Sequence, residues 1–243
     1  MGKKDKQEDI ARVTAMVQSA LGAHLESLIL YGSVVQGITD GQFSDVNLLC
    51  VVDEISAERL ETLAPALAWW ARQKYPPMVL LSRDEQRDSS DVFPLEYLDI
   101  MHQRRVLAGR DCFADVPRHP QLHRLQVEHD LRTQLIRLRG AYALAQDDAG
   151  KLEQLLLQSL VTFLVLFRHA LLVVGEPLVL QLEPIIAAAA ARFNFDPGPW
   201  RRLLDARMNS QRLPKDEVKR MFFSYLHDIQ AVERALERHG KQS

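Results

Sequence analysis

The stretch that decides the fold is LILYGSVVQGITDGQFSDVNLLCVVD, residues 28–53. The apolar run 25–31 (LESLILY) predicts a buried strand that ends at Gly32-Ser33. A second apolar run, 45–52 (DVNLLCVV), predicts another strand, and the residues between the two runs are rich in turn formers. The sequence therefore places a Gly-Ser turn at the end of one strand and a polar pair, Asp45 and Asn47, at the start of the next.

The segments around this pair alternate between helix and strand patterns. Gly22 marks the end of the first helix, and Pro65 is expected to kink or divide the second. Ser82 and Glu85 have the spacing of a capping box, which begins a short helix. We predict helices over 10–21 and 56–74 and strands over 78–81 and 91–100, with Pro94 near the start of the last strand. This order indicates a mixed sheet with helices.

From about residue 122 the pattern is helical only. Turn or stop signals such as Gly175-Glu176-Pro177 separate the helices. The predicted helices are 122–146, 151–174, 178–193, 199–208 and 215–239. The sequence therefore predicts an α+β protein with two domains, a mixed-sheet domain over 1–116 and a C-terminal helical bundle over 117–243.

The composition of the 243 residues is that of a well-packed globular protein, with 47% hydrophobic and 26% charged residues. A net charge of −2 gives no general attraction to phosphate backbones, so a nucleic-acid partner is not expected. Cys50 and Cys112 form neither a disulfide framework nor a zinc motif. Together with a charged start that does not resemble a signal peptide, they predict a cytoplasmic protein.

One segment, 152–174, is long and apolar enough to be considered as a membrane span. It carries Glu153, Arg168 and His169, whose burial in lipid would be costly. We therefore predict that this segment is a buried helix of the bundle and that no membrane is involved.

The Gly-Ser turn followed by an acid-x-polar pair resembles the nucleotidyltransferase superfamily of the kanamycin nucleotidyltransferase and DNA polymerase beta type. The signature of that superfamily is Gly-Gly or Gly-Ser followed by Asp-x-Asp or Asp-x-Glu. The resemblance covers 25–53 closely and 77–113 more loosely, where DVFPLEYLDIMHQRRVLAGRD looks like the last strand of the domain and its exit. It implies a nucleotidyltransferase fold and transfer of a nucleoside monophosphate from an NTP to a hydroxyl.

The resemblance also implies roles for particular residues. Gly32 and Ser33 would bind the triphosphate. Asp45 would be catalytic and a metal ligand, and Asn47 would lie on the same face of the strand as a second ligand. Glu96 would be the third acid, both catalytic and metal-binding, with Asp99 as the alternative. The implied cofactor is Mg²⁺, which Mn²⁺ could replace.

Asn47 departs from the family pattern, because an amide oxygen can touch Mg²⁺ but brings no negative charge. Two functions therefore stay open: an active nucleotidyltransferase with a small-molecule or protein acceptor, and a catalytically degenerate relative that binds a nucleotide or another protein. A third alternative is an antitoxin-like partner protein that binds through its helical bundle. The sequence identifies neither the acceptor nor the oligomeric state.

Overall fold

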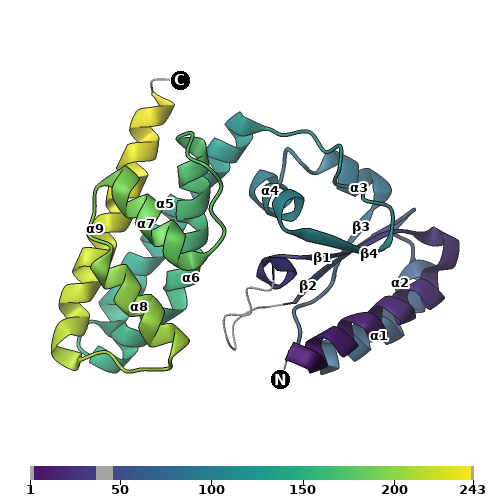
Figure 1. Ribbon diagram of the computed structural model, residues 1–243, viewed down its shortest axis with the longest axis horizontal. Coiled ribbons are helices and arrows are strands. Elements are labelled where there is room, and N and C mark those ends of the chain that lie inside the picture. Colours follow the sequence, from purple (N-terminus) through teal and green to yellow (C-terminus); the bar gives the residue numbers. More distant parts are fainter. Residues whose placement is uncertain (1–2, 37–45, 242–243) are drawn as a thin grey trace. The chain divides into compact units, whose positions relative to one another are not determined.

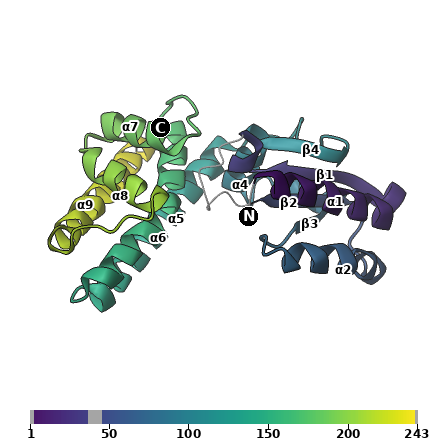
Figure 2. The same cartoon turned by 60° about the horizontal axis from the view of Figure 1, so that its bottom comes forward.

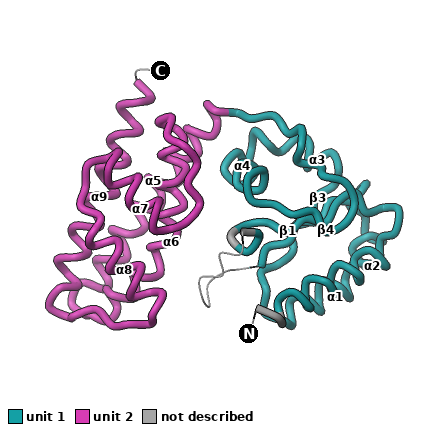
Figure 3. The backbone as a smooth tube through the Cα atoms, in the orientation of Figure 1, with its two compact units in different colours: residues 1–119 teal, residues 120–243 magenta. Residues whose placement is uncertain are grey.

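The structure is a computed structural model that describes residues 3–36 and 46–241. The chain divides into two compact units, Met1–His119 and Pro120–Ser243 (Figure 3). The segment that links the last strand of the first unit to the first helix of the second also contains the boundary predicted after residue 116. The first unit contains the sheet, and the second contains only helices in its described part.

The sheet of the first unit has four strands in the order β3-β2-β1-β4, which Figure 2 shows most clearly. The central pair β1 and β2 is antiparallel, β4 is antiparallel to β1, and β3 is parallel to β2. The strands are β1 (Leu25–Tyr31), β2 (Asn47–Val52), β3 (Val79–Ser82) and β4 (Arg104–Gly109). The predicted mixed sheet is confirmed, and β1 has the predicted bounds.

In the described part of the first unit, four α-helices accompany this sheet: α1 (Lys3–Leu21), α2 (Ala57–Arg72), α3 (Arg83–Asp88) and α4 (Pro94–His102). Gly22 follows α1 with φ +53°, and the Ser82–Glu85 capping box at the start of α3 is present, as predicted. Of the two effects expected at Pro65, a kink or a division of the helix, the division does not occur, since α2 is continuous. Leu63 and Ala66 on either side of Pro65 are buried, so tertiary packing holds this helix together.

Side chains alternate along the strands and fill two cores, one on each face of the sheet. Helices α1 and α2 cover one face, where Leu28, Leu30, Leu48 and Cys50 are buried (Figure 1). Helix α4 covers the other face, where the buried residues are Ile29, Leu49, Val51, Tyr97, Ile100 and Phe113. Both faces of β1 and β2 are therefore buried, which explains their nearly continuous apolar sequences.

The strand predicted over 91–100 was wrong. Residues 94–102 form α4 instead, with Pro94 at its first turn, and the strand that completes the sheet is β4. The apolar and polar residues of 91–100 fit a half-exposed strand and a short amphipathic helix about equally well. Pro94 favours a helix that begins at this residue, because its fixed φ and missing N–H suit the first helical turn.

The second unit consists of α5 (Pro120–Ala145), α6 (Ala149–Val173), α7 (Leu182–Phe193), α8 (Gly198–Met208) and α9 (Lys215–Gly240). This confirms the predicted order of helices. An aromatic cluster lies at its centre, where Trp200 contacts Phe167 at 4.8 Å and Tyr225 at 4.3 Å between ring centroids. By length and composition α6 is apolar enough to cross a membrane, but its polar residues Glu153, Arg168 and His169 are buried within this unit.

Candidate functional site

The turn after β1 depends on a glycine. Gly32 has φ +86°, a left-handed conformation that side chains with a Cβ rarely adopt. Its N–H donates to the carbonyl of Gln103 at 2.9 Å, and its carbonyl accepts from the N–H of Val35 at 3.0 Å. A Cβ on Gly32 would lie 3.2 Å from Nδ2 of Asn47. The predicted phosphate turn is therefore tight, and it lies against the side chain of Asn47.

Asn47 begins β2 directly opposite Tyr31 of β1. Because side chains alternate along a strand, Asn47 shares a face with Leu49 and Val51, which pack toward α4. Tyr31 packs against the same core. Asn47 and Tyr31 thus lie on the α4 face of the sheet, at the end where β1 meets the Gly-Ser turn.

Glu96 reaches this region from a helix and not from the predicted strand. It lies in the first turn of α4 and is exposed. Burial raises the pKa of Tyr31, and the charge of Glu96 raises it further, so the carboxylate is within electrostatic reach of the phenol. The structure therefore brings Glu96 to the same face and the same end of the sheet as Asn47. The alternative acid, Asp99, lies one turn further along α4 and is partly buried.

Of the two remaining predicted site residues, the structure describes Ser33 but not Asp45. Ser33 begins the short 3-10 helix η2 (Ser33–Gln36), while Asp45 lies outside the described residues. Within the described ranges, no group of three or more His, Cys, Asp or Glu residues is placed to hold a metal ion. Asn47 and Glu96 offer oxygen donors of the kind that Mg²⁺ prefers, but they would need Asp45 to complete a site.

Sequence reasoning missed β4 and the ion pair at its start. Arg104 lies opposite Tyr31, and its Nε and Nη2 each approach a carboxylate oxygen of Asp111 at 2.9 Å. The guanidinium also donates to the carbonyl of Met101, near the end of α4. Hydrogen bonding from Arg104 is the main reason that the pKa of Asp111 is lowered. Arg104 therefore ties α4 to the segment after β4, beside the candidate site.

The sequence signal from which β4 could have been predicted is the β-branched and apolar centre of RRVLAG, followed by Gly109. In the structure Gly109 has φ +77°. A Cβ on Gly109 would lie 2.2 Å from the carbonyl oxygen of Glu26, so only glycine fits where β4 passes β1. This strand contains no carboxylate. Glu96, the acid expected on a neighbouring strand, therefore lies on α4.

The mixed four-stranded sheet of the first unit and the helices of the second define an α+β fold with a helical C-terminal unit. A similar solved structure is spectinomycin adenyltransferase AAD(9) from Enterococcus faecialis with ATP and spectinomycin. It has a TM-score of 0.55 and 15% sequence identity, over 92% of this chain and 99% of that chain. No protein-family model matches the chain, and no curated protein matches it in sequence. At this identity the likeness shows the fold.

Proposed function

We propose that this chain binds a nucleoside triphosphate at the end of β1 and transfers the nucleoside monophosphate to a hydroxyl group of an acceptor. The observation that carries the proposal is that Gly32, Asn47 and Glu96 lie at one end of the sheet, with Asn47 and Glu96 on the α4 face. The similar fold of an adenyltransferase that was solved with ATP supports the same function.

In this proposal the turn at Gly32 receives the phosphates. The missing Cβ lets a phosphate approach the backbone closely, and Ser33 follows at the start of η2. Asp45, Asn47 and Glu96 would hold Mg²⁺ or Mn²⁺, which when bound offsets the negative charge of the phosphates. The Asn47 side chain lies close to this turn, since a Cβ on Gly32 would lie 3.2 Å from its Nδ2.

Glu96 is the proposed general base. Its carboxylate would accept the proton of the acceptor hydroxyl while the hydroxyl oxygen forms a bond to the α-phosphorus and pyrophosphate leaves. The exposure of Glu96 allows an acceptor to reach it from solvent. Spectinomycin in the similar structure favours a small-molecule acceptor, and a protein hydroxyl is the alternative.

The first experiment is a calorimetric titration of a non-hydrolysable ATP analogue with Mg²⁺ into the wild-type protein and into Asp45→Ala, Asn47→Asp and Asp91→Asn. Asp91 is an exposed acid just before α4 and serves as a matched control. We expect metal-dependent binding that Asp45→Ala abolishes, Asn47→Asp strengthens by roughly tenfold through the added charge, and Asp91→Asn leaves unchanged. Wild-type binding that is indifferent to metal and to Asp45 would contradict the proposed site.

A second candidate function is a catalytically degenerate, nucleotide-binding or protein-binding module. Asn47 favours it, because this position brings no charge to a metal. Pyrophosphate release in the presence of hydroxyl acceptors separates the two functions. Transfer that Glu96→Gln reduces by at least about a hundredfold supports the enzyme. Nucleotide binding without transfer, or binding that appears only in Asn47→Asp, supports the degenerate module.

A further inference from the structure

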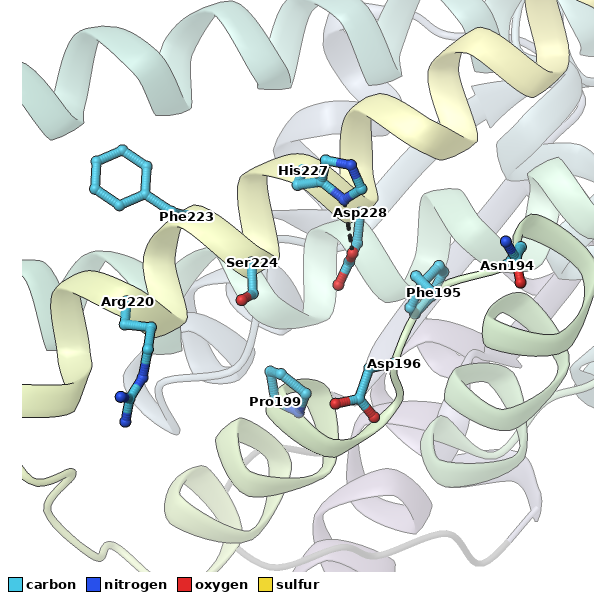
Figure 4. Close-up of a pocket in the computed structure, with 9 residues that line it drawn as sticks. All are labelled: Asn194, Phe195, Asp196, Pro199, Arg220, Phe223, Ser224, His227 and Asp228. Carbon is cyan, nitrogen blue, oxygen red and sulfur yellow. Dashed lines mark hydrogen bonds and ion pairs between the residues drawn. The ribbon is translucent and has the colours of Figure 1, made fainter.

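The helical unit contains a pocket of about 740 Å³ on a different part of the chain from the site described above. One face of α9 and the turn between α7 and α8 form it (Figure 4). Pockets that bind small organic molecules commonly have volumes of about 300–1,000 Å³. This pocket is therefore large enough for such a ligand within the helical unit alone.

Two carboxylates line this pocket. Asp228 on α9 is only 5% exposed, and its Oδ2 accepts a hydrogen bond from Nε1 of Trp200 at 3.0 Å. Asp196 comes from the turn before α8 and is exposed, with Oδ1 accepting from the N–H of Gly198 at 2.9 Å. Figure 4 shows Asp196 and Asp228 on opposite sides of the hollow.

The surroundings of Asp228 favour a positively charged ligand. Burial raises its pKa, and the negative charge of Asp196 acts in the same direction, although the Trp200 hydrogen bond acts against both. His227 lies beside Asp228 with Nδ1 at 3.4 Å from Oδ1, and its side chain is 70% exposed. Arg220 also lines the pocket, but its guanidinium lies 3.7 Å from Glu217. A cation near the two aspartates would replace solvation that the buried carboxylate has lost.

Part of the pocket lining is apolar or aromatic, beside the polar and charged residues. Phe223 is 49% exposed, so part of its ring is accessible to a ligand. Its ring is held edge-on against Tyr142, with centroids 5.5 Å apart, so the wall is fixed in place. Phe195 and Pro199 form other parts of the lining. Aromatic faces attract organic cations, and they also bury the apolar part of a ligand.

The arrangement fits an organic cation better than a metal ion. The aspartates and His227 do not form one of the three-residue groups that could hold a metal, and the described chain contains none elsewhere. We propose that this pocket binds a small primary ammonium compound, with the ammonium group at Asp196 and Asp228 and an apolar body against Phe223 and Pro199. This inference is independent of nucleotidyl transfer.

The test uses phenethylammonium as the probe and the intact chain as the protein. The indole N–H of Trp200 is hydrogen-bonded to Asp228, so its NMR signal reports directly on the pocket. The signals of Trp69 and Trp70, which belong to the sheet unit, serve as an internal control. We expect a saturable shift of the Trp200 signal alone, and no shift with phenethyl alcohol, which has a similar body without the charge.

Matched variants distinguish the effect of a lost carboxylate on ligand binding from an effect on folding. Asp196→Asn keeps an oxygen that can accept from Gly198, and it is expected to weaken binding by at least about tenfold. Asp205→Asn removes an exposed acid of α8 outside the pocket and is expected to leave binding unchanged. Phe223→Ala is expected to weaken binding about threefold to tenfold and provides a second variant at an exposed position.

Three results would overturn the inference: no saturable shift of the Trp200 signal, equal binding of the neutral alcohol, or binding that Asp196→Asn leaves unchanged. A Trp200 shift produced by Mg²⁺ alone at similar concentrations would also overturn it, because the pocket would then select charge without an organic body. Loss of binding in both Asp196→Asn and Phe223→Ala, with normal unfolding of both variants, would support it.

Discussion

The candidate site of the sheet unit and the core of the helical unit place their polar groups in different ways. In the sheet unit, the candidate site residues lie where a strand or helix begins or ends, and Glu96 is exposed to solvent. In the helical unit, charged and polar side chains such as Glu153 and Asp228 lie inside the core and are held by specific partners. Exposed polar groups add little free-energy cost to the folded state, because water still solvates them. Buried polar groups stabilise the fold only while their hydrogen-bond partners are present.

This difference implies that substitutions will separate binding from stability. Changes at the end of β1 should reduce ligand binding and alter the free energy of unfolding modestly. Changes among the buried polar groups and rings of the helical unit should mainly reduce the free energy of unfolding. The following experiments test that contrast.

The largest loss is expected for Trp200→Ala. Trp200 is fully buried, packs against Phe167 and Tyr225, and donates a hydrogen bond to Asp228. Its removal leaves a cavity and takes the indole hydrogen bond from the buried Oδ2 of Asp228, so the free energy of unfolding should fall by about 3–5 kcal/mol. Urea denaturation measures this change. Trp200→Phe keeps part of the ring packing and should lose less, and equal losses in the two variants would contradict the packing argument.

A smaller loss is expected for Glu153→Ala. The buried carboxylate accepts from the N–H of Leu213 at 2.7 Å and from Nη1 of Arg212 at 2.9 Å, so it fastens the segment before α9 to α6. Without it, the Leu213 N–H is left buried and unsatisfied, at a cost of about 1–3 kcal/mol. Asp147→Ala, an exposed acid before α6, is the control and should change the free energy of unfolding by less than about 0.5 kcal/mol.

Gly32→Ala tests the sheet unit. Its positive φ and the nearby Asn47 side chain should reduce the free energy of unfolding by about 1–2 kcal/mol. Nucleotide-analogue binding, measured by calorimetry well below the unfolding transition, should fall by more than about tenfold. Gly22→Ala is a useful comparison, because Gly22 also has a positive φ but a Cβ there meets nothing within 4 Å. If both variants retain binding, the turn at Gly32 does not contact the ligand.

The smallest effects concern pH, and they have opposite signs for Glu26 in the sheet unit and Asp228 in the helical unit. Hydrogen bonding from Arg83, aided by Arg110, lowers the pKa of Glu26, whereas burial raises the pKa of Asp228. The stabilisation from Glu26 is present above its unfolded pKa and is lost as the pH falls through the folded pKa. Asp228 acts oppositely, since stability falls as the pH rises from its unfolded pKa to its folded pKa.

Glu26→Gln should therefore make the free energy of unfolding of the sheet unit fall less as the pH is lowered. Asp228→Asn should make the free energy of unfolding of the helical unit fall less as the pH is raised. Each slope is at most about 1.4 kcal/mol per pH unit for one proton. Urea titrations between about pH 3.5 and 6, with the indole NMR signals of Trp70 and Trp200 reporting on the two units, measure both. If Glu26→Gln and Asp228→Asn change the pH slope of the unfolding free energy in the same direction, the contrast is refuted.

Much of the fold could be predicted from local patterns. The Gly-Ser turn between two apolar runs predicts β1 and β2, because buried strands need continuous apolar residues and a glycine where φ is positive. The capping box at Ser82 fixes the start of α3. The helical unit follows from apolar periodicity and turn residues, and even the buried charges of α6 are consistent with a bundle helix once partners exist.

The candidate site could be predicted only in part. Local sequence identifies Gly32 and Asn47, since both belong to the turn and the strand that follow each other along the chain. Glu96 was assigned to the wrong kind of element, because a short segment with a proline near its start fits a half-exposed strand and an amphipathic helix about equally. Its approach to Tyr31 depends on how α4 packs on the sheet.

By itself, the sequence determined the elements whose signals are local: the strands that flank the Gly-Ser turn, the caps and the order of the helices. Only the tertiary structure decided which face each polar residue occupies, that β4 and not 91–100 completes the sheet, and that Asp196 and Asp228 share a pocket. The physical reason is that hydrogen bonds and side-chain periodicity act over a few neighbouring residues, while pairing, burial and electrostatic contact join residues that are distant in the chain.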